Sequence, residues 1–237
     1  MKVTHLKHLY SRIGFGLNQK SYSSLLGKSK TDIVSSIIQK SINTKELEID
    51  LSAYEAYVSA KSNNKKKDSK SIRMLAQKSR QDVKKLNYAW LDRLRDTDQL
   101  LREKMTLFWA NVFVCKDNNI LFIQQYNNIL RAHALGNFGD FVKAVAKSAA
   151  MSKYLNNKQN SKDSPNENFA RELMELFTLG VGNYSETDIK EAARAFTGWA
   201  FKKDGSFFLR ERKHDNGSKT FFGESGNFNG EDIIDII

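Results

Sequence analysis

The sequence has few of the residues that cross-link chains, break helices or hold metals: one cysteine, one proline and four histidines among 237 residues. The lone cysteine, Cys115, cannot form an internal disulfide, which fits a reducing compartment. No apolar run approaches the roughly 18 residues that cross a bilayer, so we expect no membrane insertion. Residues 1–16 contain no apolar segment like that of a signal peptide. As it stands the chain is expected in the cytoplasm, and would be exported only if an upstream signal was lost.

The residues that are present fit a globular protein. Hydrophobic residues make up 40% of the chain and charged residues 27%, and the length suits one domain with an ample core. Apolar residues recur at helical spacing along most of the chain. We therefore predict a mainly α fold, a multi-helix orthogonal or bundle-like array, forming a single domain over residues 1–237.

Particular segments give sharper expectations. Asn137 is placed to cap a helix, and Ser185 and Asp188 occupy the ends of a capping box. Residues 98–115 carry a wide apolar face that is predicted to be buried. This face consists of Leu101, Met105, Phe108, Trp109, Val112 and Phe113.

The end of the chain changes character. Two short β-prone runs flank Asp215-Asn216-Gly217, a strong turn sequence, so we predict a β-hairpin over residues 206–222. Residues 229–237 are predicted to form the start of another helix. Its isoleucines, Ile233 and Ile234 among them, have no partner downstream in the sequence, which indicates a truncated chain.

The net charge of +11 raises the question of nucleic acid. Much of the excess lies in residues 61–85, and the part from 61 to 70 has no apolar side chain, so it is predicted to be a solvated basic loop. Clustered cations gain affinity by displacing counterions from phosphates, and nucleic-acid binding at 61–85 is one hypothesis. No recognition motif with interleaved aromatics accompanies the charge, which favours a plain basic surface.

The segment "PNENFARELMELFTLG", residues 165–180, concentrates charge among apolar residues. Pro165 ends the preceding loop, and Asn166 can cap the helix that follows. The predicted core face consists of Phe169, Leu173, Leu176 and Gly180. The adjoining polar face consists of Asn168, Arg171, Glu172 and Glu175, with Arg171 and Glu175 as an i,i+4 pair.

These charges allow two interpretations. A short connection leads to a second helix bearing Glu191 and Arg194, so the two helices are expected to be antiparallel neighbours that can share a buried ion network. Alternatively, Glu172 and Glu175 are a catalytic pair in acid–base or metal chemistry. Metal sites on helices usually include histidine, and none lies within about thirty residues of the pair. We therefore expect no metal or cofactor here and favour helix–helix pairing.

The remaining candidates have structural interpretations. His133 lies at a predicted helix end, where a histidine favours the negative end of the helix dipole. The other histidines are expected to be structural or on the surface. Cys115 follows an aromatic segment and is expected to be a small core residue, not a nucleophile.

Several blocks together resemble a known family. "RIGFG", "LREKMTLFWANVF", "RAHALGNFGDFVKAVAKSAAM", "PNENFAREL" and "YSETDIKEAARAFTGW" occur in the order seen in a large bacterial family catalogued as domain of unknown function 1800. The resemblance runs nearly end to end. It implies a mostly helical protein, usually about twice this length, with no agreed activity and in many members an export signal. It also implies that a C-terminal half is missing here, and this half or an unknown protein is the expected partner.

The chain departs from the family pattern at two places. Many members read tryptophan-histidine-asparagine-histidine-phenylalanine where this chain has Trp109-Ala110-Asn111-Val112-Phe113. Many read glutamate-leucine-histidine-threonine-leucine where this chain has Glu175-Leu176-Phe177-Thr178-Leu179. If those histidines bind metal or move protons in relatives, this chain has lost them. The positions that still match the motifs are His133, Asn168, Arg171, Glu172, Glu175 and Arg194.

Three functional hypotheses follow. The first is a helical scaffold or partner-binding module without chemistry of its own, and it is the one we favour. The second is a metal-dependent or hydrolase-like enzyme with its site on the 166–180 helix, using Glu172 or Glu175 as base and Arg171 or Arg194 to hold an anion. The third is nucleic-acid binding through residues 61–85.

Overall fold

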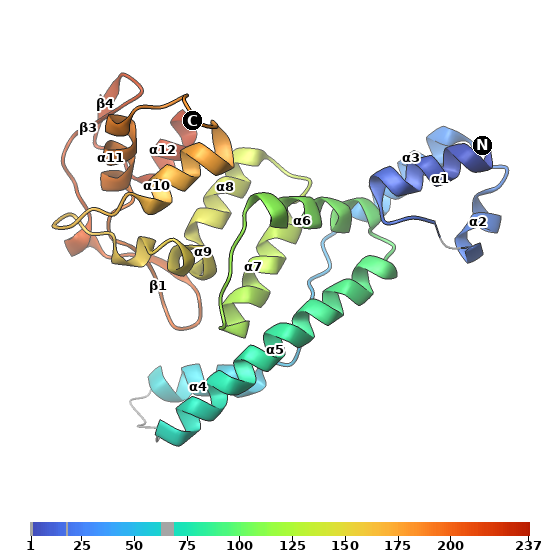
Figure 1. Cartoon of the computed structure of the whole chain (residues 1–237), viewed down its shortest axis with the longest axis horizontal. Coiled ribbons are helices and arrows are strands. Elements are labelled where there is room, and N and C mark those ends of the chain that lie inside the picture. The colour runs from blue at the N-terminus through green and yellow to red at the C-terminus, as the bar shows by residue number, and fades with distance from the viewer. Residues whose placement is uncertain (1, 18, 63–68) are drawn as a thin grey trace.

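The computed structural model describes residues 2–17, 19–62 and 69–237, and it is mainly α-helical, as predicted (Figure 1). The described residues form twelve α-helices and two small antiparallel sheets. The first helices are α1 (Val3–Ile13), α2 (Gln19–Leu25), α3 (Lys30–Ile42), α4 (Ser52–Ser62), α5 (Ser69–Arg95) and α6 (Leu100–Val112). They are followed by α7 (Ile120–His133), α8 (Phe138–Lys147), α9 (Ala149–Tyr154), α10 (Asn168–Glu172), α11 (Glu186–Ala195) and α12 (Gly230–Ile236). None of these helices is long and apolar enough to cross a membrane.

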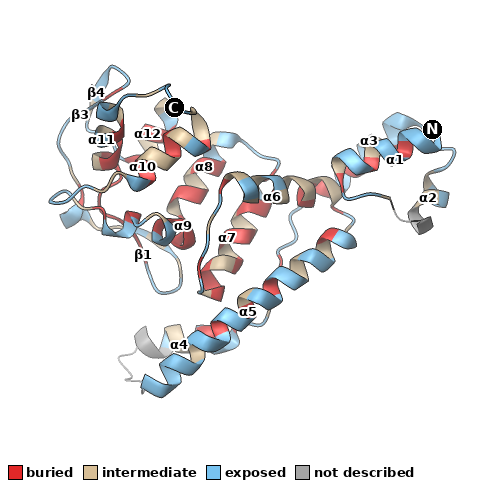
Figure 2. Cartoon of the chain, viewed as in Figure 1, coloured by how far each residue is buried: buried red, intermediate tan, exposed pale blue. Residues whose placement is uncertain are grey.

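The buried apolar residues form two clusters. The larger cluster draws mainly on α7–α12, where buried positions are concentrated (Figure 2), and includes Leu86 of the mostly exposed α5. The smaller cluster consists of Leu6, Tyr10, Ile33 and Ile37 on α1 and α3. These two helices project with α2 from one end of the molecule (Figure 1). Helix α6 contacts α1 and α3 as well as α7, so it joins the two clusters.

The predicted buried face of α6 is wrong in part. Its buried residues are Arg102, Glu103 and Thr106, whereas Phe108 is 52% exposed. Phe113, directly after the helix, is fully buried as predicted. The polar face turns inward because its charged groups find partners on α3 and α7, elements far away in the sequence.

Two helix starts follow the predicted chemistry. The Asn137 side chain accepts a hydrogen bond from the Asp140 amide at 3.0 Å and begins α8. Ser185 and Asp188 form a complete capping box at the start of α11. Each cap satisfies backbone N–H groups that have no partner in the first turn of a helix.

The strands pair differently from the predicted 206–222 hairpin. Strand β1 (Trp199–Phe201) pairs with β2 (Phe207–Leu209), and β3 (Lys219–Phe221) pairs with β4 (Glu224–Gly226). The two runs that flank Asp215-Asn216-Gly217 therefore belong to different sheets. The turn itself is held by α11, because Arg194 Nε donates to Asp215 Oδ2 at 2.8 Å.

Two further expectations concern the C-terminal isoleucines and the predicted basic loop. Ile233 and Ile234 are buried in the larger cluster, and α12 contacts α8 and α11, so these side chains have partners within the chain. Most of the predicted basic loop, residues 63–68 of 61–70, lies outside the described residues. Its flanking positions are helical, at the end of α4 and the start of α5.

Candidate functional site

The proline-led helix begins slightly later than predicted. The Asn166 side chain accepts a hydrogen bond from the Asn168 amide at 3.1 Å, and α10 starts at Asn168. The Asn166 amide in turn donates to Oδ1 of the buried Asn160 at 2.9 Å. Asn160 also donates its side-chain amide to the Ala193 carbonyl at 2.8 Å. The entry to α10 is thereby tied to α11.

Helix α10 passes directly into a π-helical segment, Leu173–Thr178. The Leu179 amide donates to the Met174 carbonyl at 2.9 Å, five residues back, and Thr178 Oγ1 donates to the Leu173 carbonyl at 2.7 Å. The extra residue in the turn rotates the following side chains. Phe177 is buried, and Leu176 is 62% exposed, so the prediction that Leu176 lies in the core is wrong.

Arg171 links the two neighbouring helices. Its guanidinium donates two parallel hydrogen bonds of 2.8 Å each to Glu186, at the start of α11. A weaker contact of 3.3 Å joins it to Glu167. The Glu186 carboxylate raises the pKa of Arg171, and Arg171 lowers the pKa of Glu186. Arg171 therefore pairs with Glu167 and Glu186 instead of the predicted Glu175.

The two glutamates proposed as catalytic have different surroundings. Glu175 accepts a hydrogen bond from the Tyr184 hydroxyl at 2.8 Å. The half-buried Glu172 side chain makes no hydrogen bond or ion pair with another residue that the structure describes. No group of three or more His, Cys, Asp or Glu residues with the geometry of a metal site occurs within the described ranges.

Arg194 and His133 lie in other parts of the structure. Arg194 binds Asp215 at 2.8 Å and Glu191 at 2.9 Å. The Asp215 carboxylate raises the pKa of Arg194, and Arg194 lowers that of Asp215. His133 ends α7 and stacks on Phe141, with ring centroids 5.7 Å apart, and its burial lowers its pKa. The predicted polar residues thus belong to separate groups, not to one network.

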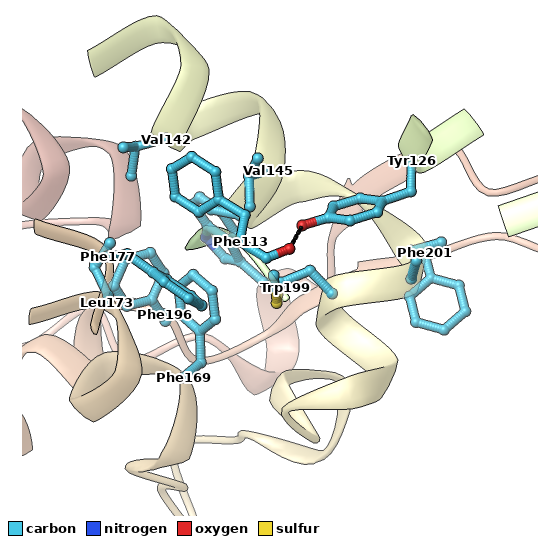
Figure 3. Packing of buried hydrophobic residues seen from close by; sticks show 14 of the residues in the cluster. Phe113, Tyr126, Val142, Val145, Phe169, Leu173, Phe177, Phe196, Trp199 and Phe201 are labelled. Carbon is cyan, nitrogen blue, oxygen red and sulfur yellow. Dashed lines mark hydrogen bonds between the residues drawn. The ribbon is translucent and has the colours of Figure 1, made fainter. Parts of the chain in front are cut away.

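Aromatic rings occupy the region in which the family resemblance places histidines. The Phe177 ring lies 5.3 Å from that of Phe113, and the Trp109 ring lies 5.6 Å from Phe113 (Figure 3 shows Phe113 and Phe177 in the packed interior). Phe141 contacts both Trp109 and Phe113, at 5.3 and 5.0 Å, and is itself stacked on His133. Trp109 and Phe113 of one motif and Phe177 of the other therefore lie close together. In this chain they form an apolar contact with a single histidine at its edge.

A buried ion cluster between α6 and α7 was not expected from the sequence. Arg131 and Glu103 form an ion pair of 2.7 Å with both side chains fully buried. Glu103 also accepts a hydrogen bond from Trp90 Nε1 at 3.0 Å. Arg102 donates to carbonyls of both α3 and α7, including Ser41 at 2.8 Å. The indication available in the sequence was three adjacent charged residues in an otherwise largely apolar helix.

A cavity was also not predicted from the sequence, because its walls come from segments that are far apart in the chain. It has a volume of about 450 Å³ and lies between α4, α5, the start of α7, the end of α9 and the β1–β2 turn. Aromatic and aliphatic side chains line it together with lysines and an arginine. None of the predicted polar residues of the proline-led helix and its neighbours lines this cavity, whereas five residues between 72 and 80, within the basic range 61–85, do.

The comparisons with known proteins address the family alone. No curated protein and no solved structure matches the chain. The family model described as "Protein of unknown function (DUF1800)" matches residues 8–237. The chain therefore belongs to the DUF1800 family.

Proposed function

We propose that this chain is a helical partner-binding module, and that the charges of its proline-led helix serve to lock two helices together. The observation that carries the proposal is the two-pronged contact of Arg171 with Glu186, at 2.8 Å for each hydrogen bond. A guanidinium held in this way by a neighbouring helix is not free to bind the anionic group of a substrate. Glu175 is similarly engaged by Tyr184.

An exposed apolar patch supplies a surface for a protein partner. It consists of Phe108, Trp109, Leu135 and Phe138, and we call it the Trp109 patch. Phe108 is 52% exposed, Leu135 40% and Phe138 41%. The Trp109 ring lies 5.0 Å from Phe108 and 5.5 Å from Phe138. Contiguous exposed apolar residues of this kind commonly mark protein–protein contacts, and aromatic residues contribute most to such contacts.

Site-specific crosslinking tests this function. A photoreactive phenylalanine analogue at position 138 is expected to give a discrete crosslinked protein in cells that express the chain. The additional change Phe108→Ser should abolish that product. The same analogue at Tyr88, a residue that is 69% exposed on α5, is the matched control. Equal products from positions 138 and 88, or none from 138, would overturn the assignment of the Trp109 patch.

An enzyme remains the alternative because Glu172 is half-buried and has no partner within the described residues. In this alternative Glu172 acts as a general base. The variants Glu172→Gln and Glu167→Gln, assayed side by side against ester, phosphate-ester and peptide substrates, separate the two functions. Activity that is lost only in Glu172→Gln would favour the enzyme.

Nucleic-acid binding at residues 61–85 is supported less well. On the helical part of this range, Lys78 and Lys85 both pair with Asp82, at 2.7 and 2.8 Å, so part of the positive charge is neutralised. Affinity for a duplex that falls steeply with salt concentration would support it. A flat response would remove this hypothesis.

A further inference from the structure

The cavity described above has the size and chemistry of a small-ligand site. Its volume of about 450 Å³ lies within the range of pockets that hold small molecules and cofactors. The walls come from five separate segments of the chain, α4 and α5 among them. It shares no lining residue with the proline-led helix or with the Trp109 patch.

The cavity is lined by an excess of positive charge. Five cationic side chains contribute to it, whereas Asp117 is the single acidic residue in the wall. The cationic residues are Arg80, Lys153, Lys158, Lys202 and Lys203. Lys153 pairs with Asp117 at 2.8 Å, and the other four make no ion pair with a residue that the structure describes. Such a wall attracts an anionic group, and the start of α7 beside it adds the positive end of a helix dipole.

Apolar and aromatic side chains also line the cavity. Phe122 and Phe201 lie edge to face with their ring centroids 5.3 Å apart. Tyr54 and Leu75 extend this surface, and Lys158 Nζ lies 4.5 Å from the centroid of the Phe201 ring. Aromatic faces of this kind accept the planar ring of a nucleobase.

Asp117 supplies the third feature. Its side chain is 2% exposed, and Oδ1 accepts hydrogen bonds from Lys153 Nζ and from the Asn119 amide, both at 2.8 Å. Its Oδ2 is buried without a partner. Leaving a buried carboxylate oxygen without a donor is costly, so a hydroxyl or amino group of a ligand would stabilise it.

We propose that this cavity binds a nucleoside phosphate: the phosphate lies against the lysines, the base lies against the aromatic wall, and a ribose hydroxyl or base amine donates to Asp117. Each part of this ligand matches one feature of the wall. A simple phosphate would leave the aromatic wall and Asp117 unused, and an apolar ligand would leave the cations unused. A volume of about 450 Å³ suits one small ligand, so a free mononucleotide is favoured over a strand.

Calorimetric titration of the whole chain tests this proposal. The probes are ADP, inorganic phosphate, and a single-stranded hexanucleotide of the same base. ADP is expected to bind more tightly than phosphate and than the hexanucleotide. The variant Lys202→Gln/Lys203→Gln changes two exposed side chains of the β1–β2 turn and should weaken ADP binding about tenfold, the loss expected from removing charged contacts.

A charge-matched control separates the cavity from general electrostatics. Lys7→Gln/Lys40→Gln removes the same charge from α1 and α3, at the other end of the molecule, and should leave ADP affinity within about twofold (Figure 1). Absence of ADP binding at millimolar concentration, equal weakening by both double variants, or tighter binding of phosphate or of the hexanucleotide would each overturn the proposal.

Discussion

Arg131 Nε lies 2.7 Å from Glu103 Oε1, and both side chains are fully buried between α6 and α7. The pair is surrounded by donors and acceptors that complete its hydrogen bonding. Asn128 Oδ1 accepts from Arg131 at 2.6 Å, and Trp90 donates to Glu103. Burying two charges is costly, so such a pair is stable only when every partner is present.

This relationship predicts an asymmetry between single and double variants. Arg131→Met removes the nearer cation from the buried Glu103 carboxylate, with Arg93 left 3.8 Å away, and should cost about 3–5 kcal/mol of the free energy of unfolding. Glu103→Leu combined with Arg131→Met removes both charges and should cost less than either single change. Urea unfolding of the three variants gives the comparison. A double variant that loses the sum of the two single losses would contradict a coupled pair.

Arg102 on α6 links the two hydrophobic clusters, because it bonds to residues of both α3 and α7. It donates to the carbonyls of Ser41 and Ile42 at 2.8 and 2.9 Å, and to that of Arg131 at 2.6 Å. Arg102→Met leaves these carbonyls unpaired and should lower the free energy of unfolding by at least about 2 kcal/mol. Arg95→Met is the control, because Arg95 is exposed and its ion pair is with Asp92, a residue on its own helix.

The structure also predicts which helices the change Arg102→Met destabilises. If the chain folds as one domain, as we propose, amide hydrogen exchange in Arg102→Met should accelerate in both α3 and α7. Acceleration confined to α3 would indicate instead that α1–α3 open as a separate unit.

The buried ion cluster between α6 and α7 could not be predicted from the spacing of apolar residues. Apolar periodicity identified α6 as a helix, but it assigned Phe108 to the core and could not place Arg102 and Glu103 there. The burial of those charges depends on partners near residues 41 and 131, which no local spacing reveals. The capping residues Asn137 and Ser185 were predicted correctly because a cap is a local interaction within a few residues.

The candidate site on α10 and α11 was also predicted only in part. The sequence indicated that α10 and α11 pair through charges, and Arg171 does bind α11. It could not identify Glu186 as the partner or foresee the π-helical turn, because one inserted residue in a helix has no local sequence signature. The cavity at Asp117 combines five distant segments, and only the folded chain brings them together.

The π-helical turn predicts opposite results for two leucines three residues apart. Leu173 is fully buried, so Leu173→Ala should cost about 2–5 kcal/mol of the free energy of unfolding. Leu176 is 62% exposed, so Leu176→Ala should change it by less than about 0.5 kcal/mol. Thermal or urea unfolding measures both. Similar losses at the two positions would indicate a regular α-helix that buries Leu176.

The contact between Arg171 and Glu186 predicts a small effect on stability. Both groups are partly or largely exposed, 36% and 66% for their side chains, so solvent screens their attraction. Arg171→Met should lower the melting temperature by no more than about 4 °C. Glu172→Gln, at a residue without a described partner, should lower it less. A larger loss from Glu172→Gln would show that Glu172 has a stabilising role in the fold.

Asp82 predicts how stability depends on pH. Its buried carboxylate accepts hydrogen bonds from Tyr54 and Lys78, both at 2.7 Å, and pairs with Lys85 at 2.8 Å. Burial alone would raise the pKa of Asp82, but these three donors outweigh it and hold that pKa well below its ordinary value. For a carboxyl group with a lowered folded-state pKa, the stabilisation is complete above the unfolded-state pKa, about 3.9 for Asp, and is lost as the pH falls through the folded-state pKa.

Asp82→Asn should therefore cost about 1–3 kcal/mol of the free energy of unfolding near pH 7, because three donors lose a charged acceptor. The difference from the unchanged chain should stay constant down to about pH 5 and shrink below about pH 4. Urea unfolding at several pH values from neutral to acidic measures this difference. Asp92→Asn on the same helix is the control, since that carboxylate is 68% exposed and should show almost no difference at any pH. A gap for Asp82→Asn that stayed constant into strong acid would mean that its folded-state pKa is not depressed, and that Lys78, Lys85 and Tyr54 do not act on it together.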